Sequence, residues 1–304
     1  MKISIKTVLK SGSRAVFKNA KFILLMWGTN ALAAFILTLP IYYLLVDNLN
    51  HSLMSDKLAV EFDFIWLIQF MNIYESSIGE IPFMIFSLVA VYVLILIFYN
   101  GGLISVFNFP EKNHTVDFFF GGVKYWLRFL KVVLISLIFF GLAFIVHKYL
   151  GLFIEWWFSE TENQMADFLI RLGRYILLVF FIGLVTMVSD YSKVHIAIHD
   201  STEIFQSIYQ AITFIKLNFT KVFTVFLIIA CIGAAGAILY NIVEIFIPRT
   251  PFYFLVVSFI VQQMLIIFRL FIRMYFFATE VHLFKDLSAE VVEVKAKEEK
   301  FGVK

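Results

Sequence analysis

The stretch at residues 81–107 decides the fold. It reads IPFMIFSLVAVYVLILIFYNGGLISVF and carries no charged residue. A helix of about 20 apolar residues crosses a hydrocarbon core roughly 30 Å thick, so this stretch is long enough to span a bilayer. Apolar and polar residues do not alternate along it at period two, which argues against a barrel strand. The sequence therefore predicts a transmembrane helix here.

Five further apolar runs flank this stretch. Of the 304 residues, 61% are hydrophobic and 15% are charged, whereas soluble domains average about a quarter charged residues. A water-soluble fold of this composition would expose large apolar patches. We therefore predict an all-α membrane protein with six transmembrane helices. The expected spans are 22–46, 81–107, 132–150, 168–189, 222–245 and 252–277.

Lysine and arginine are distributed unevenly between the loops. Twenty of the 25 basic residues lie in four segments that would share one side of the membrane, namely 1–21, 107–131, 190–221 and 269–304. Cytoplasmic loops carry such an excess of basic residues. The first loop on the other side, 47–80, has six acidic residues and a single lysine. We predict a multi-pass protein of the inner (cytoplasmic) membrane with its N-terminus and C-terminus in the cytoplasm.

The six spans follow a threefold pattern of hydropathy. Each unit has a basic amphipathic segment, a span, an outer loop and a returning span, and the units are about 1–107, 108–190 and 191–284. Together they form one predicted membrane domain, 1–284, followed by a charged tail, 285–304, that we expect to be mobile. Similarity between the units is weak, so duplication stays an open question.

The N-terminal segment is a predicted amphipathic helix. Five basic residues recur at a spacing of four and share one side of a helix: Lys2, Lys6, Lys10, Arg14 and Lys18. One interpretation is an interfacial helix that lies on the anionic inner leaflet. The other is that these charges only determine the topology. The sequence is compatible with both interpretations.

Three charged residues at the predicted inner ends of spans four and six form a candidate ion pair. Asp190 follows span four, while Arg269 and Arg273 lie one helical turn apart in span six. Charges in a membrane are costly and tend to be paired or functional. We favour a structural pair between Asp190 and one of the arginines. A substrate or anion site, or snorkelling without pairing, are the alternatives.

A weak metal-site pattern follows span four. His195, His199 and Glu203 are spaced by four residues, and two histidines at that spacing can bind zinc on one helical face. The pattern lacks the HExxH arrangement, so we favour a polar interfacial face and expect no metal and no cofactor. The single cysteine excludes a disulfide framework or a multi-cysteine metal site.

Two groups of small residues predict close helix packing. Gly101 and Gly102 at the end of span two allow a bend or a close helix approach. In span five, the small-residue patch 233–237 predicts helix packing within the chain.

The run Asp190-Tyr191-Ser192-Lys193-Val194, followed by an amphipathic segment into a new span, carries a family resemblance. It resembles a group of uncharacterised bacterial six-helix integral membrane proteins, in which such a run closes the fourth span. A more distant similarity is to the membrane domain that accompanies glycerophosphodiester phosphodiesterases. The chain has no room for that catalytic domain, so the resemblance implies an architecture and no reaction.

Three classes of function fit these features. We favour a non-enzymatic protein that organises lipid or a protein partner at the cytoplasmic leaflet. The alternatives are a small transporter or permease for an apolar or lipid-like substrate and a membrane-embedded metal-dependent enzyme. Mid-span polar residues are scarce, which disfavours transport of polar substrates. The expected partners are an anionic inner leaflet and, as an alternative, a membrane protein, but not nucleic acid.

Overall fold

The computed structural model describes residues 4–301 apart from 51, 53, 61–62, 110–113, 159–163, 249 and 252. Every described element of regular structure is an α-helix. The helices are α1 (Ile5–Lys18), α2 (Lys21–Leu49), α3 (Met54–Val60), α4 (Phe64–Ile73), α5 (Glu75–Asn108), α6 (His114–Trp157), α7 (Gln164–His199), α8 (Ile204–Leu217), α9 (Phe219–Ile245) and α10 (Tyr253–Phe301).

Among the described residues, six helices are long and apolar enough to cross a membrane: α2, α5, α6, α7, α9 and α10. Each contains one of the six predicted spans almost entirely, so the predicted all-α membrane fold is confirmed. The helices are longer than the spans. The predicted amphipathic segment before span three, for example, continues without a break into that span as α6.

The chain forms two compact units. Unit 1 contains Met1–Ser13, Asn100–Phe226 and Phe277–Lys304, and unit 2 contains Arg14–Tyr99 and Leu227–Phe276. Each compact unit draws on more than one of the three expected repeats, and the repeats themselves stay a prediction.

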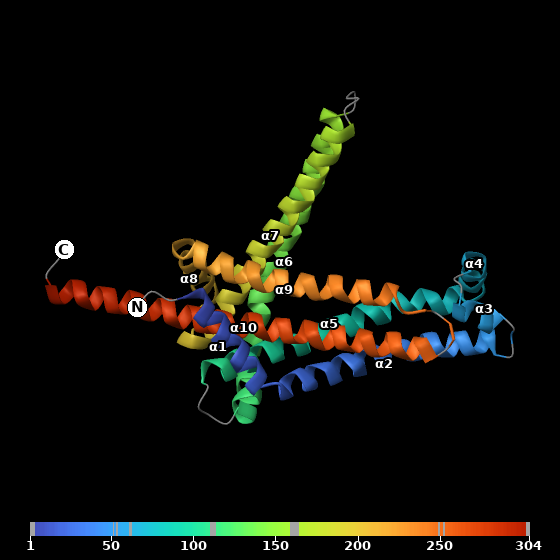
Figure 1. Ribbon diagram of the computed structural model, residues 1–304, viewed down its shortest axis with the longest axis horizontal. Helices are drawn as coiled ribbons and strands as arrows, with labels where there is room; N and C mark the ends of the chain where they lie inside the picture. Colours follow the sequence, from blue (N-terminus) through green and yellow to red (C-terminus); the bar gives the residue numbers. More distant parts are fainter. Residues whose placement is uncertain are drawn as a thin grey trace. The chain divides into compact units, whose positions relative to one another are not determined.

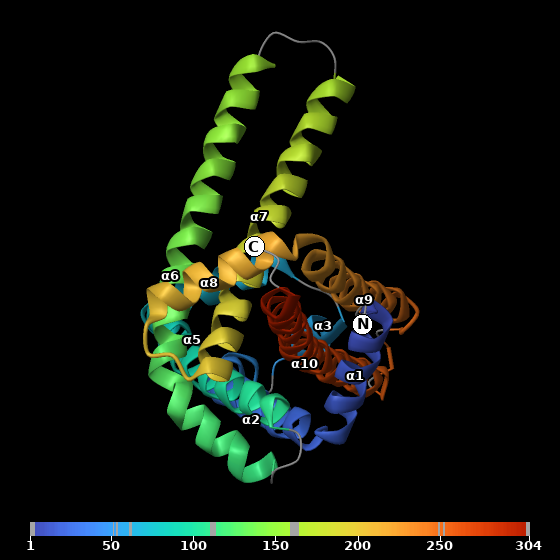
Figure 2. The same ribbon diagram turned by 90° about the vertical axis from the view of Figure 1, so that its left-hand side faces the viewer.

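In unit 1, α6 and α7 run side by side as an antiparallel hairpin (Figure 2). Near the start of α6 this hairpin packs against the end of α5. A Cβ atom added at Gly101 would lie 2.8 Å from the carbonyl oxygen of Gly121, and one added at Gly121 would lie 2.3 Å from the Cβ of Ser105. Only glycine permits this approach of the two backbones. The prediction of close packing at Gly101 is confirmed, with α6 as the partner.

The packed end of unit 1 is formed by the end of α5, the start of α6, the end of α7, α8 and the α10 segment 277–287. Its core side chains are almost inaccessible to solvent, as shown by Leu103, Phe118, Phe129, Val194 and Val281 at 0–1% exposure. The core lies at one end of the hairpin and not along its length.

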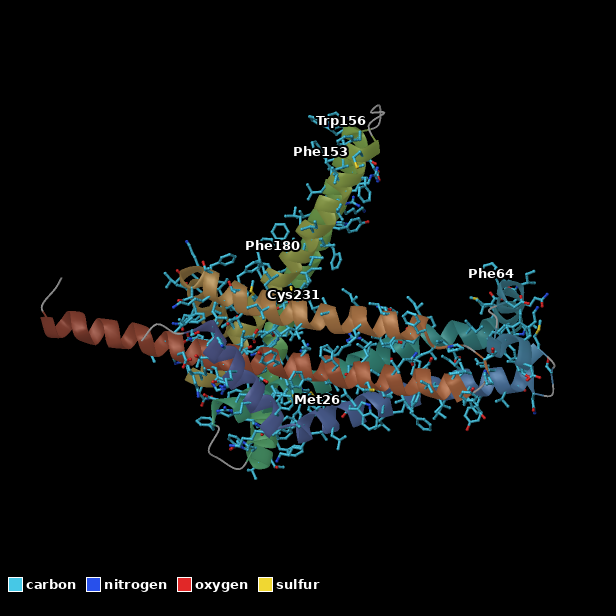
Figure 3. The ribbon with its side chains drawn as sticks, viewed as in Figure 1. Met26, Phe64, Phe153, Trp156, Phe180 and Cys231 are labelled. Carbon is cyan, nitrogen blue, oxygen red and sulfur yellow. The ribbon has the colours of Figure 1, made fainter. Side chains whose placement is uncertain are left out.

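In the far half of the hairpin, large apolar side chains are exposed instead of buried. Leu137 and Ile138 on α6 are more than half exposed, and so are Phe153 and Trp156. Figure 3 shows Phe153 and Trp156 near the far end of the hairpin, where their rings are 6.0 Å apart. Aromatic rings at a span end are typical of a membrane interface.

Unit 2 contains α2, the first part of α5, most of α9 and the first part of α10, which run side by side (Figure 1). The indole nitrogen of Trp27 donates to the Gln263 side chain over 2.9 Å, which joins α2 to α10. A Cβ atom added at Gly236 would lie 2.1 Å from the Phe268 ring. The small-residue patch of span five therefore packs against another helix of the same chain, as predicted. Cys231 on α9 is exposed (Figure 3).

The C-terminal segment differs from expectation. We expected a mobile tail from residue 285, but α10 continues through it to Phe301. Leu287 is 2% exposed, and the Lys285 ammonium donates to the carbonyl oxygen of Asn108, the last residue of α5. A cation at a helix C-terminus is favourable because the carbonyl groups there carry partial negative charge. The packed part of the chain thus extends beyond residue 285.

Candidate functional site

An apolar cavity of about 160 Å³ lies between α6, α7 and α8. Two of the three serine hydroxyls in its wall donate to carbonyl groups of their own helices, Ser136 to Val132 over 2.8 Å and Ser192 to Val188 over 2.6 Å. Apart from Ser189, the rest of the wall is apolar, so the cavity presents mostly hydrocarbon to an occupant. Its wall includes Ile135, Phe139, Leu184, Val185, Ile208 and Ile212. An engineered apolar cavity of about 150 Å³ stays dry and binds benzene, so a cavity of this size suits a piece of hydrocarbon.

A sharp chain reversal places α8 beside this cavity. Helix α7 ends at His199, and Asp200 has a φ angle of 51°, in the left-handed region. The amide of Ser201 then donates to the carbonyl of Ile196 over 3.2 Å, as in a Schellman helix end. Aspartate tolerates the left-handed conformation better than most residues. The chain therefore turns within four residues from α7 into α8.

Two basic residues of α6 hold this turn. Lys124 Nζ lies 2.8 Å from Asp200 Oδ2, and Arg128 Nη1 lies 2.7 Å from Oδ1. Arg128 also donates to the carbonyl groups of Asp200 and Ser201. The hydrogen bonds from Lys124 and then Arg128 lower the pKa of the Asp200 carboxyl group. We call Lys124, Asp200 and Arg128 the turn clamp. These three residues fix the end of α7 against α6.

Helix α8 is amphipathic. Ile204, Ala211 and Ile215 are buried on one side, whereas Phe205 and Tyr209 are 80% and 71% exposed. Large exposed apolar side chains on a surface helix are typical of a membrane-contacting or partner-contacting face. The predicted third amphipathic segment is thus confirmed as a helix, and one edge of it lines the cavity.

Asp190 has a partner close to it in sequence. Its Oδ1 lies 2.7 Å from Lys193 Nζ, one turn further along α7, and both side chains are mostly buried. Asp190 belongs to unit 1, whereas Arg269 and Arg273 belong to unit 2. The expected pairing of Asp190 with one of these arginines stays a prediction.

The histidine series is interrupted by the end of α7. The rings of His195 and His199 lie 4.6 Å apart, and both contact Phe284. Glu203 lies beyond the turn at Asp200, immediately before α8, so it does not continue their helical face. No group of three or more His, Cys, Asp or Glu side chains that could hold a metal ion occurs among the described residues.

The N-terminal amphipathic helix is confirmed as α1, with Lys6, Lys10, Arg14 and Lys18 exposed. Lys2 lies outside the described residues. The apolar face is covered by protein, because Val8, Gly12 and Val16 are buried. Of the two interpretations, an interfacial helix would require this face to be free to enter a membrane interface. Contact of α1 with lipid would instead depend on its basic side chains.

Sequence reasoning missed the turn clamp and the cavity. Lys124 and Arg128 occupy neighbouring turns of α6, which was a detectable signal, but their partner is more than 70 residues away. The cavity has no sequence signal, because its wall is assembled from three helices with ordinary apolar residues.

The fold defines the class of protein, an all-α membrane protein. Six of its described helices are long and apolar enough to span a membrane. No protein-family model matches the chain, no curated protein is significantly similar to it, and no solved structure matches it. The resemblance to the bacterial six-helix family therefore stays a prediction.

Proposed function

We propose that the protein is a non-enzymatic, lipid-binding membrane protein that acts at the cytoplasmic leaflet. The observation that supports this function best is the apolar cavity beside the amphipathic helix α8. A cavity lined mainly by hydrocarbon suits part of an acyl chain. An amphipathic helix next to it would lie at the boundary between headgroups and acyl chains.

The charge pattern supports the cytoplasmic side. Helix α8 follows α7 at the end where the positive-inside rule places the cytoplasm. The exposed basic side chains of α1, including Lys6, Lys10 and Arg14, would attract anionic lipids to the same leaflet. In this arrangement the protein would retain lipid and organise its surroundings without altering the lipid chemically.

Filling the cavity tests this function. Val185 lines the cavity, and Val185→Phe would occupy the space where an acyl chain is proposed to lie. Val179→Phe is the matched control, because Val179 is on the same helix with 68% exposure and does not line the cavity. Native mass spectrometry of the full chain in mild detergent would count the phospholipids retained by each variant. We expect Val185→Phe to retain fewer than the wild type and Val179→Phe to retain the same number. Equal retention by all three proteins would contradict the proposal.

A second function, transport of an apolar or lipid-like substrate, is favoured by a different observation. Unit 2 contains a larger cavity of about 1020 Å³ between α2 and α5, next to Asp47 and Glu80. We expect this cavity to face the outside. Transport predicts that the reconstituted protein moves a fluorescent phospholipid between leaflets, as measured by dithionite quenching. Quenching no faster than in protein-free vesicles would leave lipid binding as the better account.

A further inference from the structure

The turn clamp does not balance its own charge. Lys124 and Arg128 share the single carboxylate of Asp200, over 2.8 Å and 2.7 Å. Two further charges lie close to these residues in the chain, since Lys131 follows Arg128 on α6 and Glu203 follows the turn. These five side chains carry three positive and two negative charges. They therefore keep one positive charge that an anion from outside the chain could neutralise.

Arg128 has hydrogen-bond donors left for such an anion. Its Nη1 atom makes the three hydrogen bonds that hold the turn, to the Asp200 carboxylate and to the carbonyl groups of Asp200 and Ser201. Its Nη2 and Nε atoms bond to no acceptor in the part of the chain that the structure describes, and neither is a buried atom without a partner. The side chain is 24% exposed, so a group from outside can reach it. A guanidinium group presents its donors in a planar fork that matches the oxygens of a phosphate.

The apolar cavity begins one helical turn from Arg128. Val132 and Ser136 line the cavity. They follow Arg128 on α6 at a spacing of four residues, which places all three on one side of the helix. One turn is roughly 5.4 Å along the helix axis. Helix α8 starts at the turn clamp and lies against α6 and α7 (Figure 2), and its Ile208 and Ile212 belong to the cavity wall. The basic groups and the hydrocarbon wall thus follow one another along one side of α6.

The position of Arg128 along α6 suits a lipid phosphate. The third predicted span begins at Val132, so Arg128 lies about one turn outside the expected hydrocarbon core. Lipid headgroups lie immediately outside that core. Tyr209 of α8 is 71% exposed, and exposed tyrosine is typical of the same boundary. In a phospholipid the glycerol backbone joins the phosphate to the acyl chains. A phosphate beside Arg128 would therefore place an acyl chain at the cavity.

We propose that Arg128 and Lys124 bind the phosphate group of an anionic phospholipid whose acyl chain occupies the cavity between α6, α7 and α8. The inference rests on the proposed lipid-binding function and adds the class of lipid. The charge of the clamp selects the headgroup, whereas the cavity holds an acyl chain of any lipid. Asp200 then has two effects: it holds the two cations in place, and it competes with the phosphate for them.

Native mass spectrometry of the delipidated full chain in mild detergent tests this site. The probes are phosphatidylglycerol, phosphatidylcholine and diacylglycerol with identical acyl chains. The wild type should bind phosphatidylglycerol most tightly, because phosphatidylcholine carries a cation of its own and diacylglycerol has no phosphate. Arg128→Gln should weaken the affinity for phosphatidylglycerol roughly tenfold, since a charge-assisted hydrogen bond is lost, and should leave the affinity for diacylglycerol unchanged. Lys148→Gln is the matched control. It removes a positive charge about 30 Å further along α6 and should change none of the affinities.

Asp200→Asn separates a phosphate site from a purely structural clamp. This substitution removes the charge that competes with the phosphate, so the affinity for phosphatidylglycerol should rise severalfold. If the clamp only holds the turn, Arg128→Gln and Asp200→Asn should both lower the affinity for all three lipids, and that result would overturn the proposal. Lys124→Gln serves if Arg128→Gln does not fold. Equal affinity of Lys124→Gln and the wild type for phosphatidylglycerol would likewise contradict the site.

Failure of this inference and failure of the proposed function give different results. If no lipid occupies the cavity, Val185→Phe leaves the affinity for diacylglycerol unchanged. If lipid occupies the cavity but the clamp does not select the headgroup, Val185→Phe weakens binding of all three lipids, while the wild type and Arg128→Gln show the same preference among them. Binding of phosphatidylglycerol that depends on Arg128 but not on Val185 would contradict a single lipid in both places.

A soluble phosphate is the other source of the same oxygens. Inorganic phosphate has no acyl chain for the cavity, so it should not displace phosphatidylglycerol from the wild type at equal concentration. Complete displacement under these conditions would assign the site to a soluble phosphate and would overturn the proposal.

Discussion

The packed end of unit 1 and the far half of its hairpin share α6 and α7 but bury different kinds of residue. At the packed end, polar side chains such as Ser192, Lys193 and Thr279 are buried together with aromatic rings. In the far half, large apolar side chains such as Ile138 and Phe144 point outward. In a bilayer, apolar character therefore marks the outer surface, whereas glycine contacts and buried polar side chains mark the core.

The largest expected effect comes from the glycine contact between α5 and α6. Gly121→Leu places a side chain where even a Cβ atom would lie 2.3 Å from Ser105. Because the Ser105 side chain and the carbonyl oxygen of Gly101 already fill this space, the two helices must separate, and we expect little folded protein. Size-exclusion chromatography in detergent would measure the monodisperse fraction. Gly141→Leu on the same helix is the control, since nothing lies within 4 Å of a Cβ there. Similar losses of monodisperse protein in both variants would show that the close contact between α5 and α6 does not limit folding.

A pair of phenylalanine truncations compares the two regions directly. Phe129 is 0% exposed at the packed end, and Phe144 is 54% exposed in the far half. Phe129→Ala leaves a cavity and should cost about 3–5 kcal/mol of unfolding free energy. Phe144→Ala removes a side chain that is mostly outside the protein core and should cost less than about 1 kcal/mol. The two costs can be compared by denaturant titration in mixed micelles. Equal costs would mean that a partner covers the far half of the hairpin.

Substitutions of Asp200 separate backbone strain from charge in the turn clamp. Asp200→Gly keeps the left-handed conformation and loses both ion pairs, with an expected cost of about 1 kcal/mol because the carboxylate is half exposed. Asp200→Ala adds the strain of a left-handed alanine, about 1 kcal/mol more. The rate of hydrogen exchange at residues 196–201 should be lowest in the wild type, higher in Asp200→Gly and highest in Asp200→Ala. The reverse order for the two variants would show that the turn does not require this conformation.

The smallest expected effect is a dependence of stability on pH. The pKa of Asp200 is below its ordinary value of 3.8 in the folded protein, because Lys124 and Arg128 stabilise the carboxylate. Its contribution is thus fully present above about pH 4 and is lost as the pH falls through the lower, folded pKa. The Tm difference between wild type and Asp200→Asn should shrink from pH 5 to pH 3. A constant difference would mean that charge does not contribute to the clamp.

The sequence predicted what depends on neighbouring residues. The six spans and the helix α1 follow from local hydropathy and from a spacing of four residues. The end of α7 was missed, because neither glycine nor proline marks the turn and Asp200 takes the left-handed conformation in their place. For the same reason Glu203 was wrongly placed on the face of His195. The cavity and the turn clamp combine residues far apart in the chain, which no local pattern encodes.

Cys231 is a natural site for attaching a spectroscopic probe. It is the single cysteine of the sequence and is exposed on α9. A nitroxide or fluorophore on this thiol would therefore label one position without any other substitution. Collisional quenching by spin-labelled lipids of known depth would then measure how far α9 sits in a bilayer, and protection from quenching would reveal a protein neighbour on that face.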